Sequence, residues 1–288
     1  MSTLLELIQR NSFDRVAVVI PEQNLRVTYG ELFSQVRMAA GQLAAAGVGR
    51  GDRVGIALPN GLPMIVAFLA ASEVGTAAPL NPLYKEDEFR FYLDDTNARV
   101  LILPPEGVDD ARRAAGDRVE VVSLESLARL KARAPSDLPY APPASDDVAL
   151  VLHTSGSTGR PKRVPLSHAN LSISAANVAR WYALGDDDVS MCVMPLFHVH
   201  GLVASTLATF ASGGTVVVPA KFSPLAFWRI ARDHGVTWYS AVPTIHQLLL
   251  ARAADPTAAS RRPPGAERLR FIRSCSAALP PEMKPVAI

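Results

Sequence analysis

The sequence has only two cysteines among its 288 residues, Cys192 and Cys275, and they lie far apart in apolar surroundings. A small secreted fold held by disulfide bonds needs more cysteines than this and is excluded. We expect both cysteines to be reduced and buried as small hydrophobic side chains.

The sequence also has little excess charge of either sign. Its 29 basic and 27 acidic residues give a formal net charge of +2 and are spread along the chain. A chain with this charge balance has no strongly basic surface to attract nucleic acid or an anionic membrane. We therefore expect no nucleic-acid partner.

Long uninterrupted apolar runs are missing as well. Residues 54–72 and 189–220 contain no Asp, Glu, Lys or Arg, but prolines and glycines break both segments. Lipid cannot satisfy the backbone groups that such breaks release. Charged side chains at Glu6 and Arg10 also exclude a signal peptide. The sequence therefore predicts a cytoplasmic protein without a membrane span.

What is present is a globular composition, 49% hydrophobic and 19% charged, in which apolar runs alternate with amphipathic ones. The runs predict strands at residues 16–20, 25–28, 54–58, 99–103, 119–122, 148–152, 189–194, 215–218, 236–240 and 270–274. Helices are expected at about 28–47, 63–74, 86–94, 124–134, 167–182, 201–211, 224–234 and 244–253. No internal repeat is visible. Apolar strands that alternate with helices predict an α/β fold with mainly parallel sheets flanked by helices.

Residues 134–147, APSDLPYAPPASDD, are rich in proline and have no periodicity. They predict a linker between a subdomain of residues 1–133 and a second of residues 148–288. The sequence stops as another helix begins near residue 281, so we expect the domain to be incomplete.

A loop of small and hydroxylated residues, Thr-Ser-Gly-Ser-Thr-Gly at 154–159, follows the apolar strand at 148–152. Glycines allow close approach of backbone N–H groups, hydroxyls donate hydrogen bonds, and Arg160, Lys162 and Arg163 supply positive charge. Phosphate binding needs these features together. The spacing fits neither the Walker loop, which has glycine before its lysine, nor the G-x-G-x-x-G fingerprint.

The full run Thr-Ser-Gly-Ser-Thr-Gly-Arg-Pro-Lys resembles the signature loop of the adenylate-forming, AMP-binding superfamily. This superfamily includes acyl-CoA synthetases, aryl-CoA ligases, luciferases and peptide-synthetase adenylation domains. The segments at 27–32, 51–54 and 79–82 resemble its N-terminal part as well. Segments 194–201, 237–246 and 271–279 look most like the oxalate–CoA ligase branch, which is related to the coumarate–CoA ligases.

The resemblance implies an ATP-dependent carboxylate–CoA ligase that uses Mg²⁺. A carboxylate attacks the α-phosphate of ATP, and the thiol of coenzyme A then displaces AMP from the acyl-adenylate. We expect a small acid, with oxalate as the first choice. Aryl, fatty and malonyl acids, or an adenylation module that loads a carrier protein, are the alternatives.

The same resemblance assigns the site residues. The phosphates of ATP are assigned to Thr154, Ser155, Gly156, Ser157, Thr158, Gly159 and Lys162, with Thr158 also facing Mg²⁺. One wall of the adenine and acyl pocket is assigned to Ser274, Ser276, Ala277 and Ala278. A second carboxylate of the acid would meet Arg273, Ser274 and Ser276, and His198 would line the carboxylate pocket. Lys162 and His198 are therefore the candidate catalytic residues.

The sequence departs from the family pattern at Arg163, where the pattern has glycine. If the position needs positive φ, arginine costs about 1–2 kcal/mol. Otherwise the arginine gains a phosphate contact.

The Tyr-Gly-x-Thr-Glu segment, the ribose-binding aspartate and the C-terminal domain with its catalytic lysine are not found in the 288 residues. We therefore expect either a truncated ligase with little activity or a non-catalytic fragment.

Overall fold

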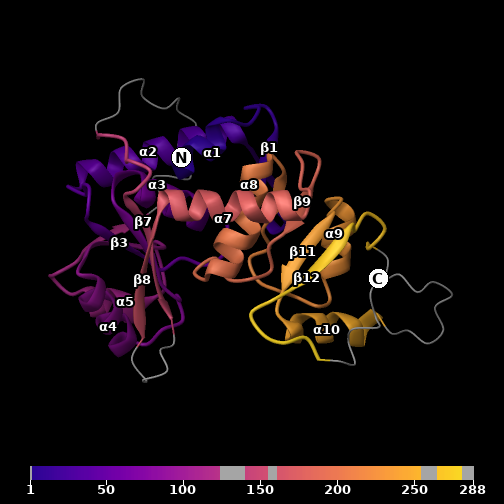
Figure 1. Ribbon diagram of the computed structural model, residues 1–288. Helices are drawn as coiled ribbons and strands as arrows, with labels where there is room; N and C mark the ends of the chain where they lie inside the picture. Colours follow the sequence, from indigo (N-terminus) through magenta and orange to yellow (C-terminus); the bar gives the residue numbers. More distant parts are fainter. Residues whose placement is uncertain (1, 124–139, 155–160, 254–264, 281–288) are drawn as a thin grey trace.

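The computed structural model of the protein describes residues 2–123, 140–154, 161–253 and 265–280, and within them the chain forms two six-stranded sheets (Figure 1). The first sheet has the order β6 (Glu120–Ser123), β5 (Ala98–Leu103), β3 (Arg53–Ile56), β4 (Thr76–Pro79), β7 (Val148–Thr154) and β8 (Lys162–Ser167). The second has the order β12 (Phe271–Ser274), β11 (Trp238–Ala241), β9 (Val189–Met191), β10 (Thr215–Val217), β1 (Val16–Ile20) and β2 (Leu25–Thr28).

Helices flank both sheets (Figure 1). The α-helices are α1 (Leu4–Gln9), α2 (Tyr29–Ala45), α3 (Leu62–Val74), α4 (Glu86–Thr96), α5 (Asp109–Ala115), α7 (His168–Trp181), α8 (Ala208–Ser212), α9 (Phe227–Asp233) and α10 (Pro243–Ala253). A 3₁₀ turn, η1 (Pro21–Gln23), and a π-helix, η2 (His200–Leu207), complete the set. Only β1–β2 and β7–β8 pair antiparallel among these strands. The predicted α/β class with mainly parallel sheets is confirmed.

Helix α3 is buried on all sides. Each of its residues except Pro63 is buried, and none carries a charge apart from Glu73. A helix that is apolar all round belongs inside a large core. The hydrophobic cluster that contains α3 also contains Leu150 of the first sheet and Val216 of the second, so one core joins the two sheets.

The start of α2 has a capping box. The side chain of Thr28 accepts a hydrogen bond from the backbone N–H of Glu31, and the Glu31 carboxylate accepts one from the N–H of Thr28. Gly47, with φ of 81°, follows the end of the helix. The predicted helix is therefore confirmed with both of its ends.

Strand β8 was not expected, because the sequence suggested that the loop at 154–159 leads directly into a helix. The strand lies at the edge of the first sheet, where Pro165 is tolerated since an edge strand need not donate every N–H. Its half-buried positions, Val164 and Leu166, alternate with exposed ones. Three further short elements, α1, β4 and α5, were also not predicted.

Both sheets contain strands from both sides of the proline-rich segment at 134–147. Strands β7 and β8 join the sheet of β3–β6, whereas β1 and β2 join the sheet of β9–β12. Residues 124–139, including the helix expected at 124–134, lie outside the described part of the chain. The division into subdomains at this segment stays a prediction.

The two sheets share a turn that the sequence analysis did not recognise as a repeat. The carboxylate of Asp52, before β3, accepts a hydrogen bond from the N–H of Gly49 at 2.9 Å. Asp188, before β9, accepts one from Gly185 at the same distance. The carbonyl of each aspartate then accepts from the threonine that opens the neighbouring strand, Thr76 or Thr215. The glycine three residues before each aspartate and the Gly-Thr pairs at 75–76 and 214–215 are the sequence traces of this repeat.

No helix among the described residues is long and apolar enough to cross a lipid bilayer.

The buried carboxyl of Glu73 makes the stability of the fold depend on pH. Burial raises the pKa of Glu73 from an ordinary 4.5 to about 7, although Arg37 opposes the shift. The folded state therefore holds this proton more tightly than the unfolded state, and stability is lost as the pH rises from about 4.5 to 7. We expect Glu73→Gln to be more stable than the parent at pH 8, by at most about 3 kcal/mol, since one pKa unit is worth about 1.4 kcal/mol.

Thermal unfolding at pH 5 and pH 8 measures this difference. The gain should shrink toward pH 5, and the exposed Glu120→Gln should show no such trend. A stability difference for Glu73→Gln that is the same at both pH values would contradict the assignment.

Candidate functional site

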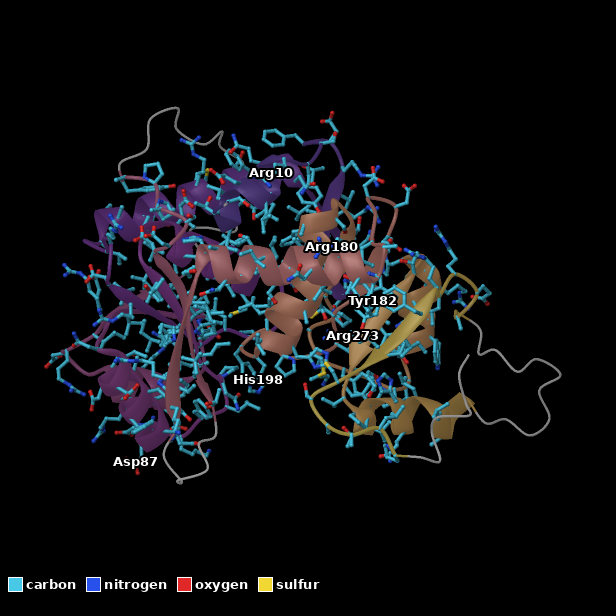
Figure 2. The ribbon with its side chains drawn as sticks, in the orientation of Figure 1. Arg10, Asp87, Arg180, Tyr182, His198 and Arg273 are labelled. Carbon is cyan, nitrogen blue, oxygen red and sulfur yellow. The ribbon has the colours of Figure 1, made fainter. Side chains whose placement is uncertain are left out.

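A polar cluster lies where β11 and β12 end. The two strands are parallel, and Ser240 stands opposite Arg273 in their register. Because side chains alternate along a strand, Ser240 and Arg273 point to one face and Ser274 points to the other. The guanidinium of Arg273 lies over the ring of Tyr182, which follows α7, with 5.9 Å between its central carbon and the ring centroid (Figure 2).

His200 is the centre of the cluster. Its Nε2 lies 2.7 Å from the hydroxyl of Ser240, and its Nδ1 lies 3.1 Å from the hydroxyl of Ser276. The Cys275 sulfur lies 3.3 Å from Nδ1 and 3.2 Å from Nε2. The two N–H directions of an imidazole diverge, so a sulfur equally close to both nitrogens lies over the ring face. The two serines thus bind the ring edge, and Cys275 packs on its face.

The environment keeps the His200 ring neutral. Burial, followed by the positive charge of Arg273, lowers the pKa of His200 to about 4. A neutral imidazole donates at one nitrogen and accepts at the other, so one serine donates to the ring and the other accepts from it. Arg273 donates a long hydrogen bond, 3.4 Å, to the Ser240 hydroxyl. Arg273 is therefore the cation of this cluster and His200 is not.

Close packing of Gly201 fixes the position of His200. A Cβ atom on Gly201 would lie 2.5 Å from the carbonyl oxygen of Pro195, too close for any other residue. The glycine lets the first turn of η2 lie against the turn after β9. The side chain of Thr206 also contacts this turn, since its hydroxyl donates a hydrogen bond to the Gly201 carbonyl at 2.9 Å. Single π-helical turns occur frequently at functional sites.

The backbone at Ser276 is strained. Its φ is 71°, a left-handed conformation that costs a residue with a Cβ about 1–2 kcal/mol. Its hydroxyl hydrogen bond to His200 helps to hold this conformation, and Ala277 and Ala278 follow it in exposed positions. Strain of this kind is concentrated at binding sites.

His198 lies outside this cluster, in the turn before η2. Figure 2 shows it in the lower middle of the view, between the β7–β8 hairpin and Arg273. The residue is exposed, and partial desolvation of its ring lowers its pKa. Its ring packs on that of Phe197, with 4.5 Å between centroids, and hydrogen-bonds to none of the described residues. Both ring nitrogens are therefore free to meet a ligand.

Thr154 and Lys162 face each other at the end of the β7–β8 hairpin. They are the last pair in its register, and both are exposed. The residues assigned to the phosphates between them, Ser155, Gly156, Ser157, Thr158 and Gly159, lie outside the described residues. The assignment of Mg²⁺ to Thr158 lies there too. In the described ranges, no three His, Cys, Asp or Glu side chains gather as a metal site.

Arg163 follows Lys162 in regular β-structure, opposite His153. It is not among the residues with positive φ, so the strain considered for this position does not occur. Its guanidinium donates to the backbone carbonyl of Asp95, at the end of α4, with 2.5 Å between the atoms.

The structure thus brings Arg273 and Ser276 to one cluster but not Ser274. The hydroxyl of Ser274 is buried on the other face of β12 without a hydrogen-bond partner among the described residues. Neither Ser240 nor His200 was identified as a site residue from the sequence. Side chains alternate along each strand, so Arg273 and Ser240 lie on the same face of the sheet. This follows only when the parallel register of β11 on β12 is known.

The expectation for the cysteines holds for only one of them. Both thiols are free, and Cys192 is fully buried, which raises its pKa to about 11. Cys275 is only half-buried, and it packs on His200. The expectation that Cys275 is a buried small hydrophobe is therefore wrong, because its strand ends in the polar cluster.

Comparison with known proteins relates the chain to a family. A probable CoA ligase of Humulus lupulus is 39% identical over 298 residues, covering 98% of this chain and 55% of the relative. The oxalate–CoA ligase of Arabidopsis thaliana is 38% identical, with 98% and 56% covered. The sulfoacetate–CoA ligase of Cupriavidus necator is 36% identical, with 93% and 53% covered. The chain spans about half the length of these relatives.

The fold matches as well. The crystal structure of ATP-bound MatB from Rhodopseudomonas palustris superposes with a TM-score of 0.85 at 24% identity, covering 99% of this chain and 56% of that one. The family model described as "AMP-binding enzyme" matches residues 6–285, almost the whole chain. The chain therefore belongs to the family of AMP-binding enzymes.

Proposed function

We propose that this chain provides the ATP- and acid-binding part of an AMP-forming carboxylate–CoA ligase for small acids, with oxalate as the first candidate. The observation that carries the proposal is the cluster of His200, Ser240, Arg273 and Ser276 at the carboxyl ends of β11 and β12. Open α/β sheets bind ligands at that edge. Membership of the AMP-binding family makes ATP the expected partner of the acid.

In this reaction the acid attacks the α-phosphate of ATP to form an acyl-adenylate and pyrophosphate, and the thiol of coenzyme A then displaces AMP. Such chemistry needs positioning and charge neutralisation more than covalent help from the protein. The ammonium of Lys162 and the hydroxyl of Thr154, on neighbouring strands, would contact the phosphates. Mg²⁺, which is commonly bound through substrate phosphates and few protein ligands, would neutralise phosphate charge there.

The acid would lie between His198 and the cluster around His200. At neutral pH His200 carries no charge, because its pKa is about 4, so it does not attract a second anion, and its ring nitrogens hold Ser240 and Ser276 in place. Arg273 supplies the positive charge, and Ser276 supplies a hydroxyl. A carboxylate bound by Arg273 leaves a second carboxylate of a small diacid free to react.

The relatives favour a small acid with two anionic groups. One relative is an oxalate–CoA ligase and another is a sulfoacetate–CoA ligase. Oxalate and sulfoacetate each have a reacting carboxylate and a second anionic group only one or two bonds away. A site with a single cation beside neutral donors suits such an acid better than it suits a long apolar or aromatic acid.

Binding of MgATP to this chain tests the nucleotide part of the proposal. Loss of the ammonium in Lys162→Met should weaken MgATP binding about tenfold or more, because a hydrogen bond to a charged group contributes about 1.5–3 kcal/mol. Isothermal titration calorimetry measures the affinity. Lys221→Met, which removes another exposed lysine, should bind as the parent does. A parent chain without measurable MgATP affinity would overturn the proposal.

Selectivity for oxalate over acetate tests the role of Arg273. In the presence of MgATP, Arg273→Met should weaken oxalate binding about tenfold or more, since it removes a charge-assisted hydrogen bond. The weak binding of acetate should change much less, because acetate has no second anionic group. The matched control is Arg268→Met, at an exposed arginine nearby. Equal losses of affinity for oxalate and acetate would show that Arg273 does not bind the second anionic group.

A further inference from the structure

The free end of the β7–β8 hairpin has little support from its own sheet. Strand β7 pairs with β4 at Leu150 opposite Ala77. Continued along the chain, this register places Pro79, the last residue of β4, opposite Leu152. Residues 153 and 154 therefore extend beyond β4, and another part of the molecule has to hold them.

That support comes from one residue of α4. The carboxylate of Asp95 lies 2.9 Å from Nε2 of His153 on β7. The backbone carbonyl of the same residue accepts a hydrogen bond from the guanidinium of Arg163 on β8. His153 and Arg163 face each other in the hairpin, directly before the pair Thr154 and Lys162. Asp95 thus binds both strands one residue pair before the two exposed side chains assigned to the phosphates.

The end of α4 is itself held firmly. The guanidinium of Arg53, the first residue of β3, donates to the carbonyls of Thr96 at 2.6 Å and Asn97 at 2.9 Å. Phe89 and Leu93 bury the inner face of the helix. Two arginines, one from each of two strands, therefore satisfy carbonyls at this C-terminus, where the helix dipole also favours positive charge.

The ring of His153 is enclosed on this side of the hairpin. It packs edge-on against the ring of Tyr92, with 4.7 Å between centroids, and Tyr84 stacks on Tyr92 in turn. Only 8% of the His153 side chain is exposed, so the ring that contacts Asp95 is held in place by its neighbours. Figure 1 shows α4 beside the lower end of β8.

We propose that Asp95 is a positioning residue that sets Thr154 and Lys162 for the phosphates of ATP, and that Arg163 is part of this contact. The inference rests on the function proposed above. Displacement of a substrate-binding group by about 1 Å costs up to about a hundredfold in rate. The arginine at a position where the family pattern has glycine thus gains a role: it joins β8 to the same residue that holds β7.

The effect of Asp95→Ala on MgATP binding tests this inference in the 288-residue chain. We expect the affinity to fall about tenfold, the value of one charge-assisted hydrogen bond of about 1.5 kcal/mol. Asp95→Asn, which keeps an oxygen acceptor for His153, should restore most of it. Arg163→Gly should also weaken binding, since it removes the contact from β8. Asp94→Ala is the matched control, because Asp94 is the exposed neighbour whose one ion pair within the described ranges is with Arg118.

Two measurements separate positioning from general stability and from failure of the proposed function. Thermal unfolding of Asp95→Ala and Asp94→Ala should coincide, whereas amide exchange at residues 152–154 and 162–164 should accelerate only in Asp95→Ala. Unchanged exchange, or an affinity equal to that of Asp94→Ala, would overturn the inference. A parent chain that does not bind MgATP would overturn the proposed function, and the exchange rates would then decide alone whether Asp95 holds the hairpin.

Discussion

The structure depends on the burial of one helix that has no polar face. Helix α3 cannot be exposed on any side, so the elements around it have to enclose it, and the same hydrophobic core then extends from Leu150 in the first sheet to Val216 in the second. Burial of apolar surface at about 25 cal/mol per Å² makes such a continuous core the main source of stability. Two sheets joined in this way act as a single support, and side chains at their edges keep fixed relative positions.

The two sheets supply different chemistry at those edges. The first sheet ends in an antiparallel hairpin, whose exposed Thr154 and Lys162 offer a hydroxyl and a flexible cation. The second ends in parallel strands, where Arg273 is held over Tyr182 and the imidazole of His200 is held neutral between two serines. A flexible ammonium suits a polyphosphate with many acceptor oxygens, whereas a fixed guanidinium suits a small acid that has to be oriented.

Sequence patterns predicted most of the fold, because the apolar runs and the caps are local signals. Thr28 and Gly47 delimit α2 without any help from tertiary structure. Elements that depend on their neighbours were missed: β8 begins with two exposed basic residues, and β4 contains small residues that become a strand only between β3 and β7. The candidate site follows the same rule. The loop at 154–159 and Arg273 are visible in the sequence, whereas the partnership of Ser240 with His200 requires the register of β11 on β12.

Arg163 illustrates why a departure from a family pattern has to be explained from its contacts. Sequence alone left two readings, backbone strain or a phosphate contact. The strand is extended, and the guanidinium is directed to the carbonyl of Asp95 at the end of α4. That carbonyl belongs to a helix C-terminus, where unpaired acceptors and the helix dipole both favour an arginine. A glycine at this position could not make the hydrogen bond to Asp95. The arginine therefore stabilises the hairpin and causes no strain in its backbone.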